Sequence, residues 1–268
     1  MARIGAVIVG LTALVSILGP WLALYDPAAQ TLAMRLQGPT AAHPFGLDEL
    51  GRDVFSRVVL GARISLFVGI TVVSVSSIVG TLVGAVAGYA RGPVDDGISR
   101  VMDVLLAFPG ILLAIALVAV LGPSLGHVVL ALSTIGWVAY ARLVRSVALK
   151  TRELDYVQAA RALGAGPARV LIRHVIPTAL PAVAVQATLG MAGAIIAEAA
   201  LSFLGLGVQP PTPSWGTMLD AGRSHLFDAP HLTIFPGLSI ALLVLGFNFL
   251  GDDLRDRLDP RTAAESMR

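Results

Sequence analysis

The segment that decides the fold lies between two long apolar stretches and reads, at residues 156–177, YVQAARALGAGPARVLIRHVIP. Residues 153–163 are mostly strong helix formers, and Gly164 is placed to end that helix as a left-handed cap. Gly166-Pro167 then favours a second helix, because proline is tolerated at a first helical position. We therefore predict two short helices joined by a tight corner, which small residues leave open to close approach by another protein.

The surrounding sequence is too apolar for a soluble fold. Of its 268 residues, 56% are hydrophobic and 13% are charged, whereas soluble domains carry about 25% charged residues. About 20 apolar residues suffice to cross the bilayer core as a helix. We predict an all-α membrane protein with six transmembrane helices, at residues 4–25, 64–90, 101–121, 127–147, 175–197 and 232–251.

The distribution of basic residues sets the orientation. The segment between the fourth and fifth predicted spans carries seven of them, and positive charge marks the cytoplasmic side. Six spans then place both termini in the cytoplasm. The segment between the first and second spans is an exception, because it lies outside in this topology and yet holds four arginines. The seven are Arg142, Arg145, Lys150, Arg152, Arg161, Arg169 and Arg173, and the four are Arg35, Arg52, Arg57 and Arg63.

These spans divide the chain into two parts. Residues 1–63 form an N-terminal anchor helix with an external segment. Residues 64–268 form a core of five transmembrane helices with a cytoplasmic loop at residues 142–177. The predicted protein is therefore multi-pass.

The composition excludes several kinds of active site. There is no cysteine, which rules out disulfides and thiolate metal sites. The single lysine, Lys150, is not preceded by glycine, so the chain has no Walker motif for ATP. The histidines lack the i, i+4 spacing of a helical zinc site, and no catalytic or nucleic-acid-binding pattern stands out. We expect neither an enzyme nor a metal site in this chain.

Small residues recur every fourth position in the second predicted span. They are Ser76, Gly80, Gly84 and Gly88. This spacing lays them along one helix face, where another backbone can approach closely. The face could pack within this chain or against a partner subunit, and the spacing alone does not choose.

The corner segment also carries a known pattern. Gln158-Ala159-Ala160 is followed after three residues by Gly164, and after nine more by His174-Val175-Ile176-Pro177. This resembles the signature of bacterial ABC-importer permease subunits, which reads Glu-Ala-Ala, three residues, Gly, nine residues, Ile-x-Leu-Pro. Gln158 replaces the usual acid, His174 the isoleucine and Ile176 the leucine.

Five further stretches extend the resemblance over nearly the whole chain. They look like motifs of the dipeptide/oligopeptide/nickel branch of inner-membrane permeases, most similar to the second, shorter "C" permease of a dipeptide system. The stretches are residues 43–53 (HPFGLDELGRD), 103–109 (DVLLAFP), 197–207 (AEAALSFLGLG), 210–216 (PPTPSWG) and 254–261 (LRDRLDPR).

The resemblance implies a type I ABC importer permease fold. It implies a permease subunit of an ATP-driven importer that passes short peptides from an external binding protein into the cytoplasm. No cofactor is then bound by this chain, because ATP and Mg would lie on one or two separate ATPase subunits. A homologous second permease, the peptide and the lipid of the plasma (inner) membrane complete the expected partners. Nickel or glutathione transport is the alternative, and an ion-gradient-driven transporter a more distant one.

In such permeases the corner is a coupling helix that sits in a groove of the ATPase subunit. By resemblance, the external binding protein would meet residues 26–63 and 208–231, the second with a short helix near residues 217–226. The coupling residues would be Tyr156, Gln158, Ala159, Ala160, Leu163, Gly164, Ala165, Gly166, Arg169 and Pro177.

Glu198 follows directly on the charge-free residues 175–197 that start the fifth predicted span, and it lies in the outer part of that span. A carboxylate at a helix centre costs about 2.5–3.5 kcal/mol on insertion scales, so it faces a partner group, water or the transport pathway. Two interpretations stay open: a structural hydrogen bond, or contact with the amino group of a peptide substrate.

Overall fold

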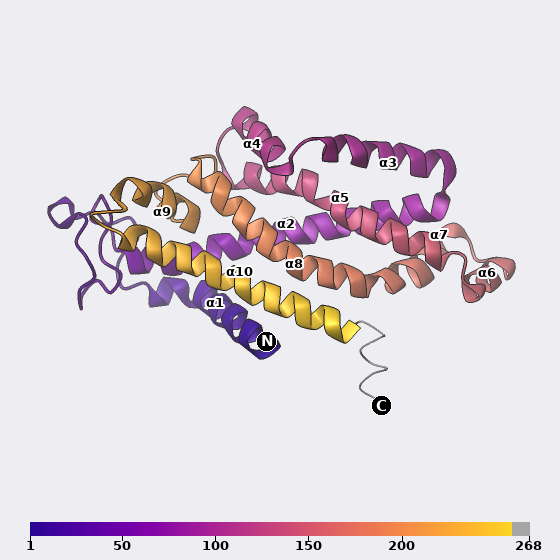
Figure 1. The fold of residues 1–268 in the computed structure, drawn as a ribbon, viewed down its shortest axis with the longest axis horizontal. Helices are drawn as coiled ribbons and strands as arrows, with labels where there is room; N and C mark the ends of the chain where they lie inside the picture. The colour runs from indigo at the N-terminus through magenta and orange to yellow at the C-terminus, as the bar shows by residue number, and fades with distance from the viewer. Residues whose placement is uncertain (259–268) are drawn as a thin grey trace.

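A computed structural model describes residues 1–258 as a bundle of helices packed along one long axis (Figure 1). The long helices are α1 (Ala2–Leu22), α2 (Val54–Ala90), α5 (Leu125–Thr151), α8 (Ile176–Phe203) and α10 (His231–Leu258). Within residues 1–258, five helices are long and apolar enough to cross a membrane, or six if the bent pair α3–α4 is counted as one span. The predicted all-α membrane fold is confirmed, and the six predicted crossings agree with the higher of these two counts.

The short elements gather at the two ends of the bundle (Figure 1). One end carries residues 23–53, which include the one-turn helix η1 (Leu32–Met34), together with α9 (Trp215–Gly222) and η3 (Arg223–His225). We refer to residues 23–53 and 204–230 as the external cap, a name that follows the orientation predicted from the sequence. The opposite end carries α6 (Asp155–Ala162) and α7 (Pro167–Val170), which form the predicted corner.

The third predicted span is not one continuous helix, which corrects the expectation for residues 101–121. It consists of α3 (Gly92–Ala107) and α4 (Gly110–Leu121), which meet at an angle of 84°. The break falls at Phe108-Pro109, where Phe108 adopts an extended conformation (φ −97°, ψ 139°). Proline has no N–H and disfavours a helical residue before it, so it ends α3 within an unbroken apolar run.

The second predicted corner helix is also not separate, because α7 runs into α8. A single π-helical turn, η2 (Leu171–Val175), joins the two, and together they form one helix of 37 residues from Pro167 to Phe203. The N–H of Ile176 reaches the carbonyl of Leu171, five residues back. This wider turn accommodates Pro177 without breaking the helix.

α2 and α5 pack with their backbones in direct contact. The glycine face of α2 meets α5 along its length: Gly80 lies against Trp137, Gly84 against Ala141, and Gly88 against Arg145. A Cβ added at Gly88 would lie 2.6 Å from the Arg145 carbonyl oxygen. The predicted face of small residues therefore packs against a helix of the same chain.

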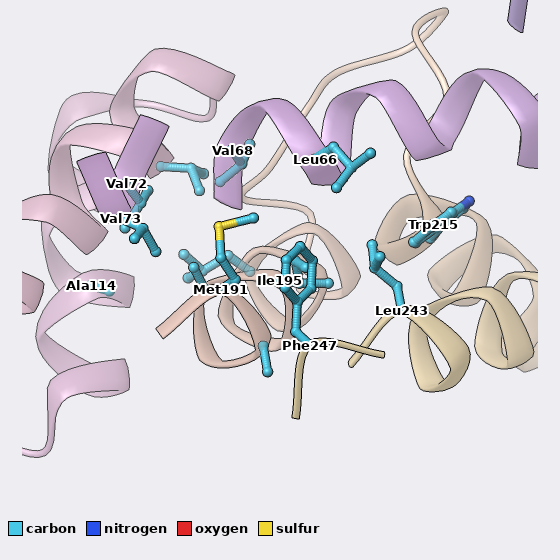
Figure 2. Packing of buried hydrophobic residues seen from close by; sticks show 14 of the residues in the cluster. Leu66, Val68, Val72, Val73, Ala114, Met191, Ile195, Trp215, Leu243 and Phe247 are labelled. Atoms are coloured by element: carbon cyan, nitrogen blue, oxygen red, sulfur yellow. The ribbon is translucent and has the colours of Figure 1, made fainter. Parts of the chain in front are cut away.

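The central core lies between α2, α8 and α10 (Figure 2). Side chains from the three helices point toward one another in this view. They are Leu66, Val68, Val72 and Val73 of α2, Met191 and Ile195 of α8, and Leu243 and Phe247 of α10, joined by Trp215 from α9. The buried indole of Trp215 donates its N–H to the Val58 carbonyl at 2.9 Å, which fixes α9 to the start of α2.

Buried ion pairs hold the external cap together. The Asp48 carboxylate accepts a hydrogen bond from Arg52 Nε at 2.7 Å and lies 3.5 Å from Arg57 Nε. Asp53 caps α2 by accepting the Ser56 N–H at 2.8 Å. Two of the four arginines that disturbed the predicted topology, Arg52 and Arg57, therefore share one buried carboxylate.

The contact between α2 and α5 predicts an asymmetry between two glycines. Gly84→Ala places a Cβ against the Ala141 backbone, and overpacking of this kind costs about 1–3 kcal/mol. Gly97→Ala, in α3, meets nothing within 4 Å and gains helix propensity. We expect the melting temperature in detergent to fall for Gly84→Ala and to hold or rise for Gly97→Ala. Equal melting temperatures would show that α2 and α5 are not in backbone contact.

Candidate functional site

The corner between α6 and α7 is closed by backbone hydrogen bonds. Gly164 has a φ of +87°, and the N–H of Ala165 reaches the Ala160 carbonyl at 3.0 Å while that of Gly164 reaches Arg161 at 3.0 Å. These two bonds form a Schellman cap, which needs a left-handed residue at the position of Gly164. α6 begins at Asp155, two residues later than predicted. The corner is thus a defined turn and not a loose loop.

Three valines fix the corner to the bundle. Val157 of α6, Val170 of α7 and Val175 of η2 are fully buried. They pack in one cluster with side chains of α5, among them Val144 and Ala148. The corner therefore moves with the ends of α5 and α8, because close-packed interiors transmit displacement. The sequence does not single out these anchors, because valines in a basic segment look alike whether they are buried or exposed.

The opposite face of the corner is exposed and partly apolar. Leu163 is 89% exposed and Tyr156 50% exposed, and Ile172 on the following turn is 68% exposed. An isolated exposed leucine is ordinary, but three large exposed apolar side chains in the segment 156–172 are typical of a surface that another protein covers. The predicted coupling residues Gln158, Ala159, Leu163, Gly164, Gly166, Arg169 and Pro177 are exposed, and Ala160 and Ala165 are half-buried.

Charged groups border the corner on the side of α2. Glu153 pairs with Arg91 at 2.8 Å and with Arg152 at 3.3 Å. Gln158 donates its amide N–H to the Glu153 backbone carbonyl at 3.0 Å. A polar hollow of about 400 Å³ is lined by Arg152, Glu153, Gln158 and Arg161. Gln158 thus makes a contact within the chain, and it does so without the charge of the usual acid.

Glu198 lies at the other end of α8, where α2, α8 and α9 meet. Its carboxyl group is fully buried and accepts hydrogen bonds from Ser202 Oγ at 2.7 Å and Ser65 Oγ at 3.3 Å. Ser214, the N-cap of α9, is also buried. A buried polar group is stable only when it is hydrogen-bonded. In this conformation the carboxyl group joins helices and presents no surface to a substrate.

Residues 1–258 contain no group of three or more His, Cys, Asp or Glu side chains that could hold a metal ion. The predicted external helix near residues 217–226 corresponds to α9 and η3. α9 is held by a capping box in which Ser214 accepts the Thr217 N–H and the Thr217 hydroxyl accepts the Ser214 N–H. The external cap is therefore ordered, and it lies at the end of the bundle away from the corner (Figure 1).

Two known families match this sequence. Residues 80–264 match the family described as binding-protein-dependent transport system inner membrane component, and residues 1–39 match the N-terminal TM domain of oligopeptide transport permease C. The first match spans the corner, Glu198 and the glycine face from Gly80 onward.

Individual relatives cover most of the chain. The dipeptide transport system permease protein DppC of Alkalihalophilus pseudofirmus is 47% identical over 261 residues, which cover 97% of this chain and 86% of that protein. The glutathione transport system permease protein GsiD of Pectobacterium atrosepticum is 49% identical over 225 residues, which cover 84% and 75%. The solved structure of the inward-facing MetNI methionine ABC transporter aligns with a TM-score of 0.62 at 18% identity, covering 75% of this chain and 96% of that one. That likeness concerns the fold alone.

The buried carboxyl group generates a prediction about stability. Glu198→Ala leaves the hydroxyls of Ser65 and Ser202 without their acceptor, and each unsatisfied buried group costs about 1–3 kcal/mol. Glu198→Gln keeps one carbonyl acceptor in nearly the same volume. We expect Glu198→Ala to lower the melting temperature in detergent and Glu198→Gln to recover most of the loss. A stable Glu198→Ala variant would mean that the carboxyl group does not join these helices.

Proposed function

The chain belongs to the family of binding-protein-dependent transport system inner membrane components, and we propose that it carries short peptides as one of two permease subunits of an ATP-driven importer. It is a multi-pass membrane protein with the type I ABC importer permease fold. The relatives named above support the cargo class, since one is named for dipeptides and another for glutathione, itself a short peptide.

The observation that carries this proposal is the corner at α6–α7. It has a fixed backbone, three buried anchors and an exposed apolar face, which suit a surface that receives force from another protein. ATP and Mg would bind on one or two separate ATPase subunits, because this chain has no Walker motif. Closure of the ATPase pair would move the corner as a rigid body and switch the access of the pathway.

The remaining partners follow from the two ends of the bundle. The basic residues cluster at the corner end, which we assign to the cytoplasmic side of the plasma (inner) membrane, together with both termini. The arginines of the tail at positions 261 and 268 lie outside the described residues. The external cap would receive the substrate-binding protein, and a homologous second permease would share the pathway.

Coupling through the corner can be tested at Leu163. Because its side chain is 89% exposed, Leu163→Asp changes the surface without touching the core. We expect ATP-dependent peptide uptake to fall about tenfold or more, the loss typical of a removed interface anchor. The amount of chain in the membrane should stay within about twofold. Gly164→Arg is a poorer test, because the left-handed backbone at this position would itself be strained.

A control and a contradicting outcome complete that test. Leu163→Met is the matched control, because it keeps an apolar side chain at the same exposed position, and it should leave ATP-dependent peptide uptake unchanged. Normal uptake by Leu163→Asp in a fully assembled complex would contradict the coupling role of the corner.

The energy source separates this proposal from an ion-gradient transporter. The assay uses proteoliposomes that contain both permeases and the ATPase, with the substrate-binding protein added. We expect dipeptide uptake to require ATP on the side of the membrane where the ATPase lies, and to stop with vanadate. Dissipating the proton gradient should not affect it. Uptake driven by a proton gradient without ATP would overturn the proposal, whereas uptake of nickel complexes in place of dipeptides would revise the cargo alone.

A further inference from the structure

An apolar cavity of about 290 Å³ opens at the middle of the bundle, between α2, α4, α5 and α8. Its walls are formed by branched side chains such as Val72 and Ile135, and four glycines make the room. The volume is at the low end of small-molecule sites, which measure about 300–1,000 Å³. It therefore suits one apolar side chain and not a whole peptide.

Ser76 places an unused hydroxyl group in this wall. The residue is 1% exposed, and its Oγ has no hydrogen-bond partner within residues 1–258. Gly136 lies opposite, where any added Cβ would come within 2.5 Å of that oxygen. A buried hydroxyl without a partner is costly, so this group points to a ligand that supplies the missing partner.

The start of α4 adds further donors to the same cavity. Gly110 and Ile111 line it, and they are the first two residues of the helix that follows the break at Pro109. Pro109 provides no side-chain cap, and the first amide groups of a helix have no intrahelical acceptor. Such a terminus carries partial positive charge and binds oxygen atoms of anions and carbonyls.

We propose that this cavity binds one apolar residue of the transported peptide, and that the Ser76 hydroxyl and the first amide groups of α4 hold an oxygen atom of the same peptide. The inference rests on the proposed function and adds a subsite to it. The break that bends α3 against α4 is then functional, because it brings a helix terminus to the middle of the bundle. Glu198 does not line this cavity, so recognition is by hydrogen bonding and shape.

The first test compares the uptake of two dipeptides by the full complex in proteoliposomes. Gly193 lines the cavity and an added Cβ meets nothing within 4 Å, so Gly193→Leu introduces a large side chain at a position with room for its Cβ. We expect dileucine uptake to fall about tenfold or more and dialanine uptake to change less than twofold, since pocket size discriminates between apolar side chains by about 10–200-fold. The matched control is Gly97→Leu, a helical glycine with equally open surroundings outside the cavity.

The second variant removes the hydroxyl group. Ser76→Ala breaks no hydrogen bond within the described chain, so the fold should be unaffected and the KM for both dipeptides should rise about fivefold to tenfold. Ser133→Ala is the matched control, because the Ser133 hydroxyl is also buried and unpartnered but does not line the cavity. Equal KM values for Ser76→Ala, Ser133→Ala and the unaltered chain would overturn the role of Ser76.

A labelling experiment decides the question if Gly193→Leu fails to assemble. The chain has no cysteine, so Ser76→Cys introduces its only thiol. We expect dileucine to slow modification of this thiol by a small methanethiosulfonate reagent at least threefold, and to leave Ser133→Cys unaffected. A thiol at position 76 that reacts at the same rate with dileucine, or does not react, would overturn the site, because a cavity open to a peptide admits a smaller reagent. Labelling needs no ATP, so it stays readable even if uptake proves independent of ATP and the proposed function fails.

Discussion

The backbone contact between α2 and α5 is the constraint on which the other features depend. Glycines on α2 let the two helices approach until backbone carbonyl groups of α5 lie against the α2 glycines. This contact fixes the C-terminal half of α5, which includes Val144 and Ala148. These two side chains belong to the cluster that anchors the corner through Val157 and Val170. It also sets Ser76 against Gly136 at the wall of the central cavity. In lipid, where burial of apolar surface does not favour helix association, close packing of this kind is the main attraction between spans.

The sequence predicts what depends on local geometry. The four-residue spacing of small residues in α2 predicts a packing face, and the structure has one there. The position of Gly164 at the end of a run of helix formers predicts a left-handed cap, and Gly164 has a φ of +87°. The sequence predicts poorly what depends on distant partners. Residues 104–141 are free of charge, and although Pro109 is a signal for a helix break, the sequence does not give the angle of 84° between the two helices. Arg52 and Arg57 count as free positive charges in a sequence, and only the folded cap shows that both are paired with the Asp48 carboxylate.

The candidate site divides in the same way. The exposed residues of the corner, such as Leu163, follow from the pattern of the segment, since that pattern describes a surface. Its buried valines do not, because a valine in a basic segment has the same sequence signal whether it faces solvent or the core. The broken helix at Pro109 and the unpaired hydroxyl of Ser76 come from α4 and α2, which are separate in the sequence and meet only in the bundle. No single stretch of sequence could have predicted the cavity.

The uninterrupted helix from Pro167 to Phe203 limits how the two membrane faces can behave. At about 1.5 Å per residue its 37 residues measure roughly 55 Å, and its hydrogen bonds prevent it from being compressed along its axis. One end carries the buried Val170 and the other carries Glu198, which is bonded to α2 and lies beside α9. An axial shift at one end of this helix must therefore appear at its other end as well. A displacement of the corner is passed along a single rigid element to the point where Glu198 joins α8 to α2, so the two ends of the bundle are mechanically connected.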